Sequence, residues 1–246
     1  MDYKIIGDLM QALRVDLTQG EEMYAEAGSM LYMSEGIEFD SKMKGGILGG
    51  LARKFLAGES LFMSVFRCNA PRAHMAFGAP ITGRIIPWEL RGTTVLAERN
   101  AYLCSIGNVD LSIAFTKRLG AGFFGGEGFI LQKITGQGMV FLNAGGNMLT
   151  FDLQPGERLR VDTGCIVAMD ASVTYDIQFV GGVKNALFGG EGLFFATLNG
   201  PGKVILQTLP FSRLADRMAQ AMGGGQGEKR GVAGFGGILK DVISGE

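Results

Sequence analysis

The chain repeats one short motif three times at a nearly constant spacing. Each copy has two apolar residues, two small residues, a glutamate, a small residue and two apolar residues, at positions 55–62, 123–130 and 187–194. The three glutamates are Glu59, Glu127 and Glu191, at spacings of 68 and 64 residues. A fixed period of this length is typical of a structural unit that buries its apolar surface against neighbouring copies. The sequence therefore predicts one pseudo-threefold body and not three independent domains.

The residues around the motif indicate several short β-strands in each unit. Apolar and polar residues alternate over 159–162 and 173–179, which is the two-residue period of half-buried strands. Glycine accounts for 40 of the 246 residues, and glycine adopts the backbone conformations that tight turns require. We therefore expect an all-β fold of packed antiparallel sheets in a single domain over 1–210. Its three repeats are expected at about 1–90, 91–154 and 155–210.

The C-terminal region has a different pattern. Phe211, Leu214, Met218 and Met222 recur at helical spacing, which predicts a short amphipathic helix. A glycine-rich linker and a short apolar tail complete the chain. Residues 211–246 are thus expected to form a helix, a linker and a tail that is either mobile or docked on a partner.

Charge and cysteine usage exclude several classes of protein. The net charge is -1, from 23 Lys and Arg against 24 Asp and Glu, so no basic excess is present to bind nucleic acid. Glycine and charged residues interrupt every apolar stretch, and the first residues do not resemble a secretory signal. Cys68, Cys104 and Cys165 form no C-x-x-C pair, which argues against a disulfide framework or a thiolate zinc site. We expect a cytoplasmic protein that binds no nucleic acid.

The sequence contains no clear catalytic signature. His74 is the one histidine, so a Ser-His-Asp, Cys-His or multi-histidine mechanism would have to use it. Its equivalents in the other two repeats are Met139 and Lys203, and we interpret it as a structural or surface residue. Cys68 follows Arg67, but neighbours on a strand point to opposite faces. The glycine-rich segment 120–126 lacks the pattern of a phosphate-binding loop. We therefore predict that the protein is not an enzyme and has no catalytic residues and no cofactor.

The repeated glutamates are the most distinctive polar residues. They lie among glycine and apolar residues, where a carboxylate is costly unless it is paired. In one interpretation each carboxylate accepts backbone N–H groups from its own turn, or pairs with Arg53, Lys117 or Lys184, and fixes a repeated bend. In the other, Glu59, Glu127 and Glu191 meet near the pseudo-threefold axis and bind a metal or another cation, because hard cations favour several oxygen ligands.

The motifs also carry a family resemblance. The Gly-Gly-Glu-Gly runs at 125–128 and 189–192, the strand at 138–142 and the segment 161–168 resemble the mitochondrial-biogenesis family named for altered inheritance of mitochondria. The likeness covers about residues 1–210 and is to its bacterial branch of conserved hypothetical proteins. It implies face-to-face antiparallel sheets, as in the tryptophan RNA-binding attenuation protein, and chains that form ring-like oligomers. It implies no catalytic residues, because the bacterial members have no established activity.

Together these observations predict a non-enzymatic, homo-oligomeric scaffold or assembly protein. Two alternatives remain open. The first is a small-ligand or cation-binding protein that uses the repeated glutamates. The second is a peripheral membrane protein that contacts a membrane surface through the glycine-rich segments or the C-terminal tail.

Overall fold

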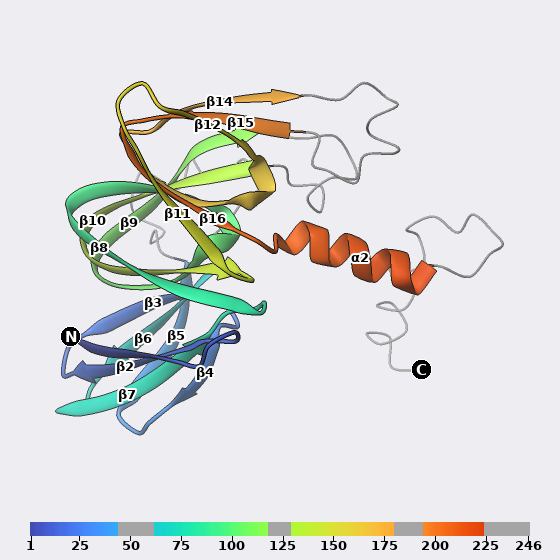
Figure 1. Ribbon diagram of the computed structural model, residues 1–246. Helices are drawn as coiled ribbons and strands as arrows, with labels where there is room; N and C mark the ends of the chain where they lie inside the picture. The colour runs from blue at the N-terminus through green and yellow to red at the C-terminus, as the bar shows by residue number, and fades with distance from the viewer. Residues whose placement is uncertain (44–61, 118–128, 180–193, 224–246) are drawn as a thin grey trace. The chain divides into compact units, whose positions relative to one another are not determined.

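The computed structural model describes residues 1–43, 62–117, 129–179 and 194–223. The chain divides into two units, residues 1–212 and residues 213–246. The first unit contains every strand of the described residues (Figure 1). The helix α2 (Phe211–Gly223) begins at the end of the first unit and continues into the second, where the sequence predicts it.

The strands form three antiparallel sheets. The four-stranded sheet has the order β1 (Asp2–Ile6), β2 (Ala12–Thr18), β7 (Arg72–Gly78) and β4 (Met30–Met33). The nine-stranded sheet has the order β11 (Met148–Leu153), β16 (Gly202–Gln207), β13 (Ile166–Asp170), β8 (Gly83–Glu98), β10 (Phe129–Gly145), β9 (Tyr102–Lys117), β3 (Glu22–Glu26), β6 (Phe62–Cys68) and β5 (Ile37–Met43). The three-stranded sheet has the order β12 (Arg158–Asp162), β15 (Phe194–Asn199) and β14 (Thr174–Phe179). Two short 3-10 helices, η1 (Arg99–Ala101) and η3 (Thr163–Cys165), precede β9 and β13. The predicted all-β class, with packed antiparallel sheets and a short C-terminal helix, is confirmed.

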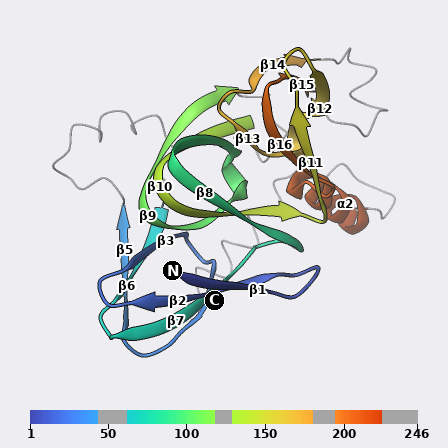
Figure 2. The same ribbon diagram turned by 60° about the vertical axis from the view of Figure 1, so that its left-hand side comes forward.

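Each sheet contributes to a buried apolar cluster. Alternate residues of β2 and β7, including Leu13, Val15 and Phe77, pack against Phe66 of β6 and Phe141 of β10. A second cluster joins the three-stranded sheet to β11, β13 and β16. A third cluster is formed largely by the nine-stranded sheet itself, which curves on itself through β8, β9 and β10 (Figure 2). Burial of apolar surface, on both faces of the central part of the nine-stranded sheet and between the sheets, is therefore the main source of stability.

The three central strands are much longer than the short strands that the sequence indicates. β8 and β9 each have 16 residues and β10 has 17. Glycines within them produce bends without ending the strand: Gly107 and Gly136 have φ values of 96° and 130°. A Cβ atom on Gly136 would lie 2.0 Å from the carbonyl oxygen of Asn108 on β9. These glycines therefore permit close approach of two curved strands, so part of the glycine content serves long bent strands and not tight turns.

The three glycine-rich motif segments connect strands in the same way. Segments 44–61, 118–128 and 180–193 join β5 to β6, β9 to β10 and β14 to β15, and each of these strand pairs is antiparallel. The segments themselves, like residues 224–246, lie outside the described residues. The threefold repeat and the likeness to the tryptophan RNA-binding attenuation protein remain predictions. In the described part of the chain, no helix has the length and apolar character needed to cross a membrane.

Candidate functional site

The most distinctive exposed surface is the outer face of the four-stranded sheet. Its other face packs against the first apolar cluster through residues such as Leu13 and Phe77. Because paired residues of antiparallel strands point to the same side, the strand register arranges the outer side chains in three rows. The first row contains Asp2, Asp16 and His74, the second contains Lys4, Arg14, Ala76 and Tyr32, and the third contains Ile6, Ala12 and Gly78.

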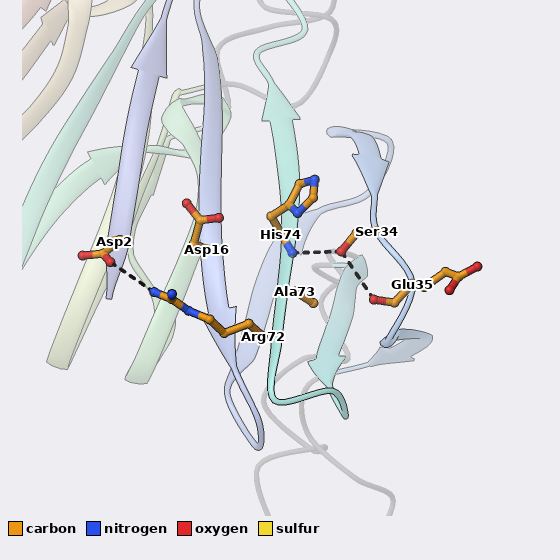
Figure 3. A pocket seen from close by; sticks show the side chains of 7 residues that line it. All are labelled: Asp2, Asp16, Ser34, Glu35, Arg72, Ala73 and His74. Carbon is orange, nitrogen blue, oxygen red and sulfur yellow. Dashed lines mark hydrogen bonds and ion pairs between the residues drawn. The ribbon is translucent and has the colours of Figure 1, made fainter.

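A polar pocket lies at the first row (Figure 3). It has a volume of about 550 Å³ and is lined by Asp2, Asp16, Ser34, Glu35, Arg72, Ala73 and His74. The Arg72 guanidinium lies 3.9 Å from the Asp2 carboxylate, and these side chains are 78% and 82% exposed. An ion pair this exposed contributes about 0–1 kcal/mol. The pocket therefore offers a positive and a negative side chain to a polar ligand, but the weak pair between them does little to hold these side chains in fixed positions.

His74 forms part of the wall of this pocket. It lies on β7, opposite Asp16 of β2, and its backbone N–H donates to the Ser34 hydroxyl oxygen at 2.9 Å. The imidazole makes an edge-to-face contact with Tyr32, with ring centroids 5.9 Å apart. The interpretation of His74 as structural or surface residue remains a prediction, and its half-buried position beside Tyr32 is compatible with it.

The third row of the outer face is apolar. Ile6 is 46% exposed, and Leu31 of β4 covers Gly78, since a Cβ on Gly78 would lie 3.0 Å from Leu31 Cδ2. Leu31 reaches this face because the β4 register shifts between Met30 and Tyr32 and leaves it as an extra residue. We call Ile6, Ala12, Gly78 and Leu31 the apolar row. In the connection between β1 and β2, which follows Ile6, Leu9 is 66% exposed and Met10 is 74% exposed.

A second group of polar residues lies where β3 and β8 end. Burial raises the pKa of Glu26 to about 7, and the positive charge of Arg99 opposes this shift. Burial also raises the pKa of Glu98 to about 7, and the negative charge of Glu26 adds to the increase. The Glu98 carboxylate accepts the backbone N–H of Asn100 at 2.9 Å. These two carboxyl groups therefore change protonation near neutral pH.

Sequence reasoning did not identify Glu26 or Glu98. A signal for Glu98 exists in retrospect, because an acidic residue two positions before Asn100 can cap a short turn at the end of an apolar strand. Tyr102 follows this turn, and its hydroxyl donates to the backbone oxygen of Tyr24 at 3.0 Å. No comparable sequence signal marks Glu26, whose burial arises from tertiary packing.

Most of the residues that the sequence singled out for a site lie outside the described part of the chain. Glu59, Glu127 and Glu191 all lie outside the described residues, as do Arg53 and Lys184, while Lys117 ends β9. Both interpretations of the repeated glutamates therefore remain predictions. Within residues 1–43, 62–117, 129–179 and 194–223, no group of three or more His, Cys, Asp or Glu side chains could hold a metal ion.

The three cysteines form no disulfide with one another. Cys68 and Cys104 are buried and Cys165 is half-buried. Burial raises the pKa of the Cys104 thiol well above its usual range, which favours the unreactive protonated form. Cys68 donates to the backbone oxygen of Ala70 at 3.2 Å.

Comparisons with known proteins agree with this fold. The family described as mitochondrial biogenesis AIM24 matches residues 3–209. An uncharacterized protein of Streptococcus pyogenes serotype M6 is 25% identical over 210 residues, which are 82% of this chain and 83% of the relative. An X-ray crystal structure of a Streptococcus pyogenes protein superposes with a TM-score of 0.73 at 24% identity, covering 89% of this chain and 99% of the other. The crystal structure therefore supports the fold.

Proposed function

Since this chain belongs to the mitochondrial biogenesis AIM24 family, we propose that it is a non-enzymatic scaffold or assembly protein that acts as a homo-oligomer. The relatives matched here do not assign it an activity. The proposal rests instead on the surface of the four-stranded sheet.

The observation that carries the proposal is the edge strand β4. Its four residues, Met30, Leu31, Tyr32 and Met33, are all apolar or aromatic and all at least 37% exposed. Soluble proteins usually protect an edge strand with charged residues or proline, and β4 has neither. A group of exposed apolar side chains of this kind marks a surface that contacts another macromolecule.

The exposed apolar residues can contribute more binding free energy than the polar pocket, which favours a protein contact over a small polar ligand. In the pocket beside His74, the pair between Arg72 and Asp2 is largely solvated, and each such pair contributes about 0–1 kcal/mol. Apolar surface contributes about 25 cal/mol for each Å² removed from water. The exposed residues of β4 and of the β1–β2 connection therefore offer the larger favourable contribution.

We place the function in the cytoplasm, and nucleic acid is not among the proposed partners. The three cysteines form no disulfide with one another, and two of them are buried, which is compatible with a reducing compartment. The net charge of -1 provides little attraction for a phosphate backbone.

Native mass spectrometry of the full-length protein as purified tests this proposal. We expect a defined oligomer whose mass is an integer multiple of 26.2 kDa, with no additional bound mass. A second measurement, light scattering after size exclusion over a hundredfold range of protein concentration, shows whether the oligomer persists in solution. A monomer at every concentration would overturn the proposal. A small molecule that remains bound to a monomer would replace it with a ligand-binding function.

A further inference from the structure

The edge strand β4 is weakly attached to the four-stranded sheet. Among the described strands β7 is its one neighbour, and the register of this pair is interrupted between Met30 and Tyr32. All four residues of β4 are at least 37% exposed, so its release would expose little additional apolar surface. Segments with few buried apolar contacts open at a lower free energy than the whole fold. β4 can therefore open locally while the rest of the sheet stays folded.

A three-residue link, residues 27–29, joins β4 to β3 of the nine-stranded sheet. β3 ends at Glu26, and Gly28 within the link has a φ of 86°. The backbone oxygen of Glu26 accepts hydrogen bonds from the N–H of Ser29 at 3.2 Å and from its hydroxyl at 2.7 Å. The backbone oxygen of Ser29 in turn accepts the N–H of Gly78 on β7 at 2.9 Å. The start of β4 is therefore held in place through the chain at Glu26.

The Glu26 carboxyl group shares its surroundings with a second acid, Glu98. Of the described side chains, Arg99 is the one whose charge lowers the pKa of either carboxyl group. One positive charge therefore acts on two carboxyl groups, and ionisation of both leaves a negative charge that burial makes unfavourable. The other titratable or charged residues around this pair are Tyr24 of β3, Tyr102 of β9, Lys42 of β5 at the register position beyond Met63 of β6, and Lys133 of β10, two residues from the register partner of Glu98.

Opening of the link relieves the cost of ionising Glu26. In the closed form the ionised carboxylate would be partly removed from water and close to Glu98, whereas in the open form water solvates it. We propose that residues 27–29 form a hinge that holds β4 on the four-stranded sheet while Glu26 is protonated and releases β4 when Glu26 is ionised. Glu98 stays in place at the start of η1, where its carboxylate accepts the backbone N–H of Asn100 at 2.9 Å, and its charge adds repulsion.

The direction of the pH dependence follows from the two environments of Glu26. Its pKa is about 7 in the closed form, against an ordinary value of 4.5 in water. The open form therefore becomes more favourable as the pH rises from about 4.5 to about 7, and it gains nothing further above that range. Between pH 6 and pH 8, the equilibrium constant for opening should rise about tenfold.

Hydrogen exchange of the full-length protein tests the hinge. The measurement is made by mass spectrometry at pH 6 and pH 8 and is corrected for the intrinsic exchange rate. The protection factor of residues 29–34 should fall about tenfold between these two pH values. β11 is the internal control, because it is also an edge strand with exposed apolar residues, Met148 and Leu149, and its protection should stay constant. No fall in β4, or an equal fall in β4 and β11, would overturn the inference.

Glu26→Gln is the decisive variant, because its amide has nearly the shape of the protonated acid and cannot ionise. Its β4 should be equally protected at pH 6 and pH 8. Glu35→Gln is the matched control, because Glu35 is an exposed residue in the link at the other end of β4, and it should keep the tenfold fall. Persistence of the fall in Glu26→Gln would overturn the hinge. The comparison of β4 with β11 uses the wild type alone and tests the hinge even if this variant does not fold.

The hinge belongs to a single chain and goes beyond the proposed homo-oligomeric function. Repeating the exchange at tenfold lower protein concentration separates the two. Unchanged protection of β4 supports the hinge, whether the protein is a monomer or an oligomer. If protection of β4 depends on concentration as strongly as on pH, the change comes from dissociation of an oligomer. That result would overturn the hinge and leave the proposed function intact.

Discussion

The molecule holds two groups of carboxyl side chains in opposite environments. In the pocket of the four-stranded sheet, Asp2 and Glu35 are exposed to water, and Asp2 has Arg72 nearby. At the ends of β3 and β8, Glu26 and Glu98 are partly buried, and burial raises the pKa of each to about 7. Glu26 and Glu98, whose pKa values are raised, are not among the residues that line the pocket. Burial is the main cause of the raised pKa values of Glu26 and Glu98, and the nearby charge of Arg99 opposes it only in part.

The largest expected effect is a dependence of stability on pH. The folded state binds protons at Glu26 and Glu98 more tightly than the unfolded chain, whose glutamates have a pKa near 4.5. Stability therefore falls as the pH rises from about 4.5 to about 7, and the loss is complete above that value. We expect the free energy of unfolding to be about 2 kcal/mol higher at pH 6 than at pH 8, since each unit of pKa difference corresponds to about 1.4 kcal/mol.

Urea unfolding at pH 6, 7 and 8 measures this dependence. Histidine is the other side chain that ordinarily changes charge in this range, so the His74→Gln variant serves as a control and should retain the dependence. A free energy of unfolding that stays constant or increases toward pH 8 would contradict the burial of these two carboxyl groups.

A smaller effect is expected from removing one buried charge. In Glu98→Gln the amide oxygen can still accept the backbone N–H of Asn100, but no charge has to be desolvated above pH 7. We expect this variant to be about 1 kcal/mol more stable than wild type at pH 8 and to have about half of the wild-type pH dependence. Glu35→Gln, in the exposed pocket, is the matched substitution and should change neither quantity. Destabilisation of Glu98→Gln at pH 8 would show that the ionised carboxylate is needed in the folded state.

The smallest effect is expected in the pocket. Asp2→Asn and Arg72→Gln should each change the free energy of unfolding by less than about 0.5 kcal/mol, because their side chains are 82% and 78% exposed. The double variant should show little coupling between them in a thermodynamic cycle. A coupling energy above about 1 kcal/mol would mean that the pocket is more ordered than its exposure indicates. The carboxyl groups of the pocket and those of Glu26 and Glu98 would then differ less in how strongly the fold constrains them.

The sequence predicted the elements that depend on local pattern. The alternation over 173–179 corresponds to β14, and the helical spacing after Pro210 corresponds to α2. The length of β8, β9 and β10 was not predicted, because the high glycine content indicated short strands and turns in general, whereas Gly136 lies within a long, bent strand. A glycine is compatible both with a tight turn and with a bend inside a strand. Whether a neighbouring strand approaches closely decides between the two, and this cannot be read from the local sequence.

The candidate sites were harder to predict than the fold. His74 stood out as the one histidine, but its pocket draws Asp2 from β1 and Asp16 from β2, which are far from it in the sequence. The apolar row depends on the strand register and on the irregularity of β4, neither of which can be read from alternation alone. Glu26 looks like any exposed strand residue in the sequence, and its burial follows from the residues packed around it.

The order of strands in the sheets has a consequence for the synthesis of the protein. The four-stranded sheet uses only residues 2–78, so it can pair while the rest of the chain is still being translated. The nine-stranded sheet cannot be completed then, because β16, at residues 202–207, lies between β11 and β13. At about 5–20 residues per second, the roughly 130 further residues that end with β16 leave the first sheet without its full neighbour for about 6–26 s. During this interval its exposed apolar residues would be available to chaperones, and a chain that ended before β16 would retain two unpaired strand edges.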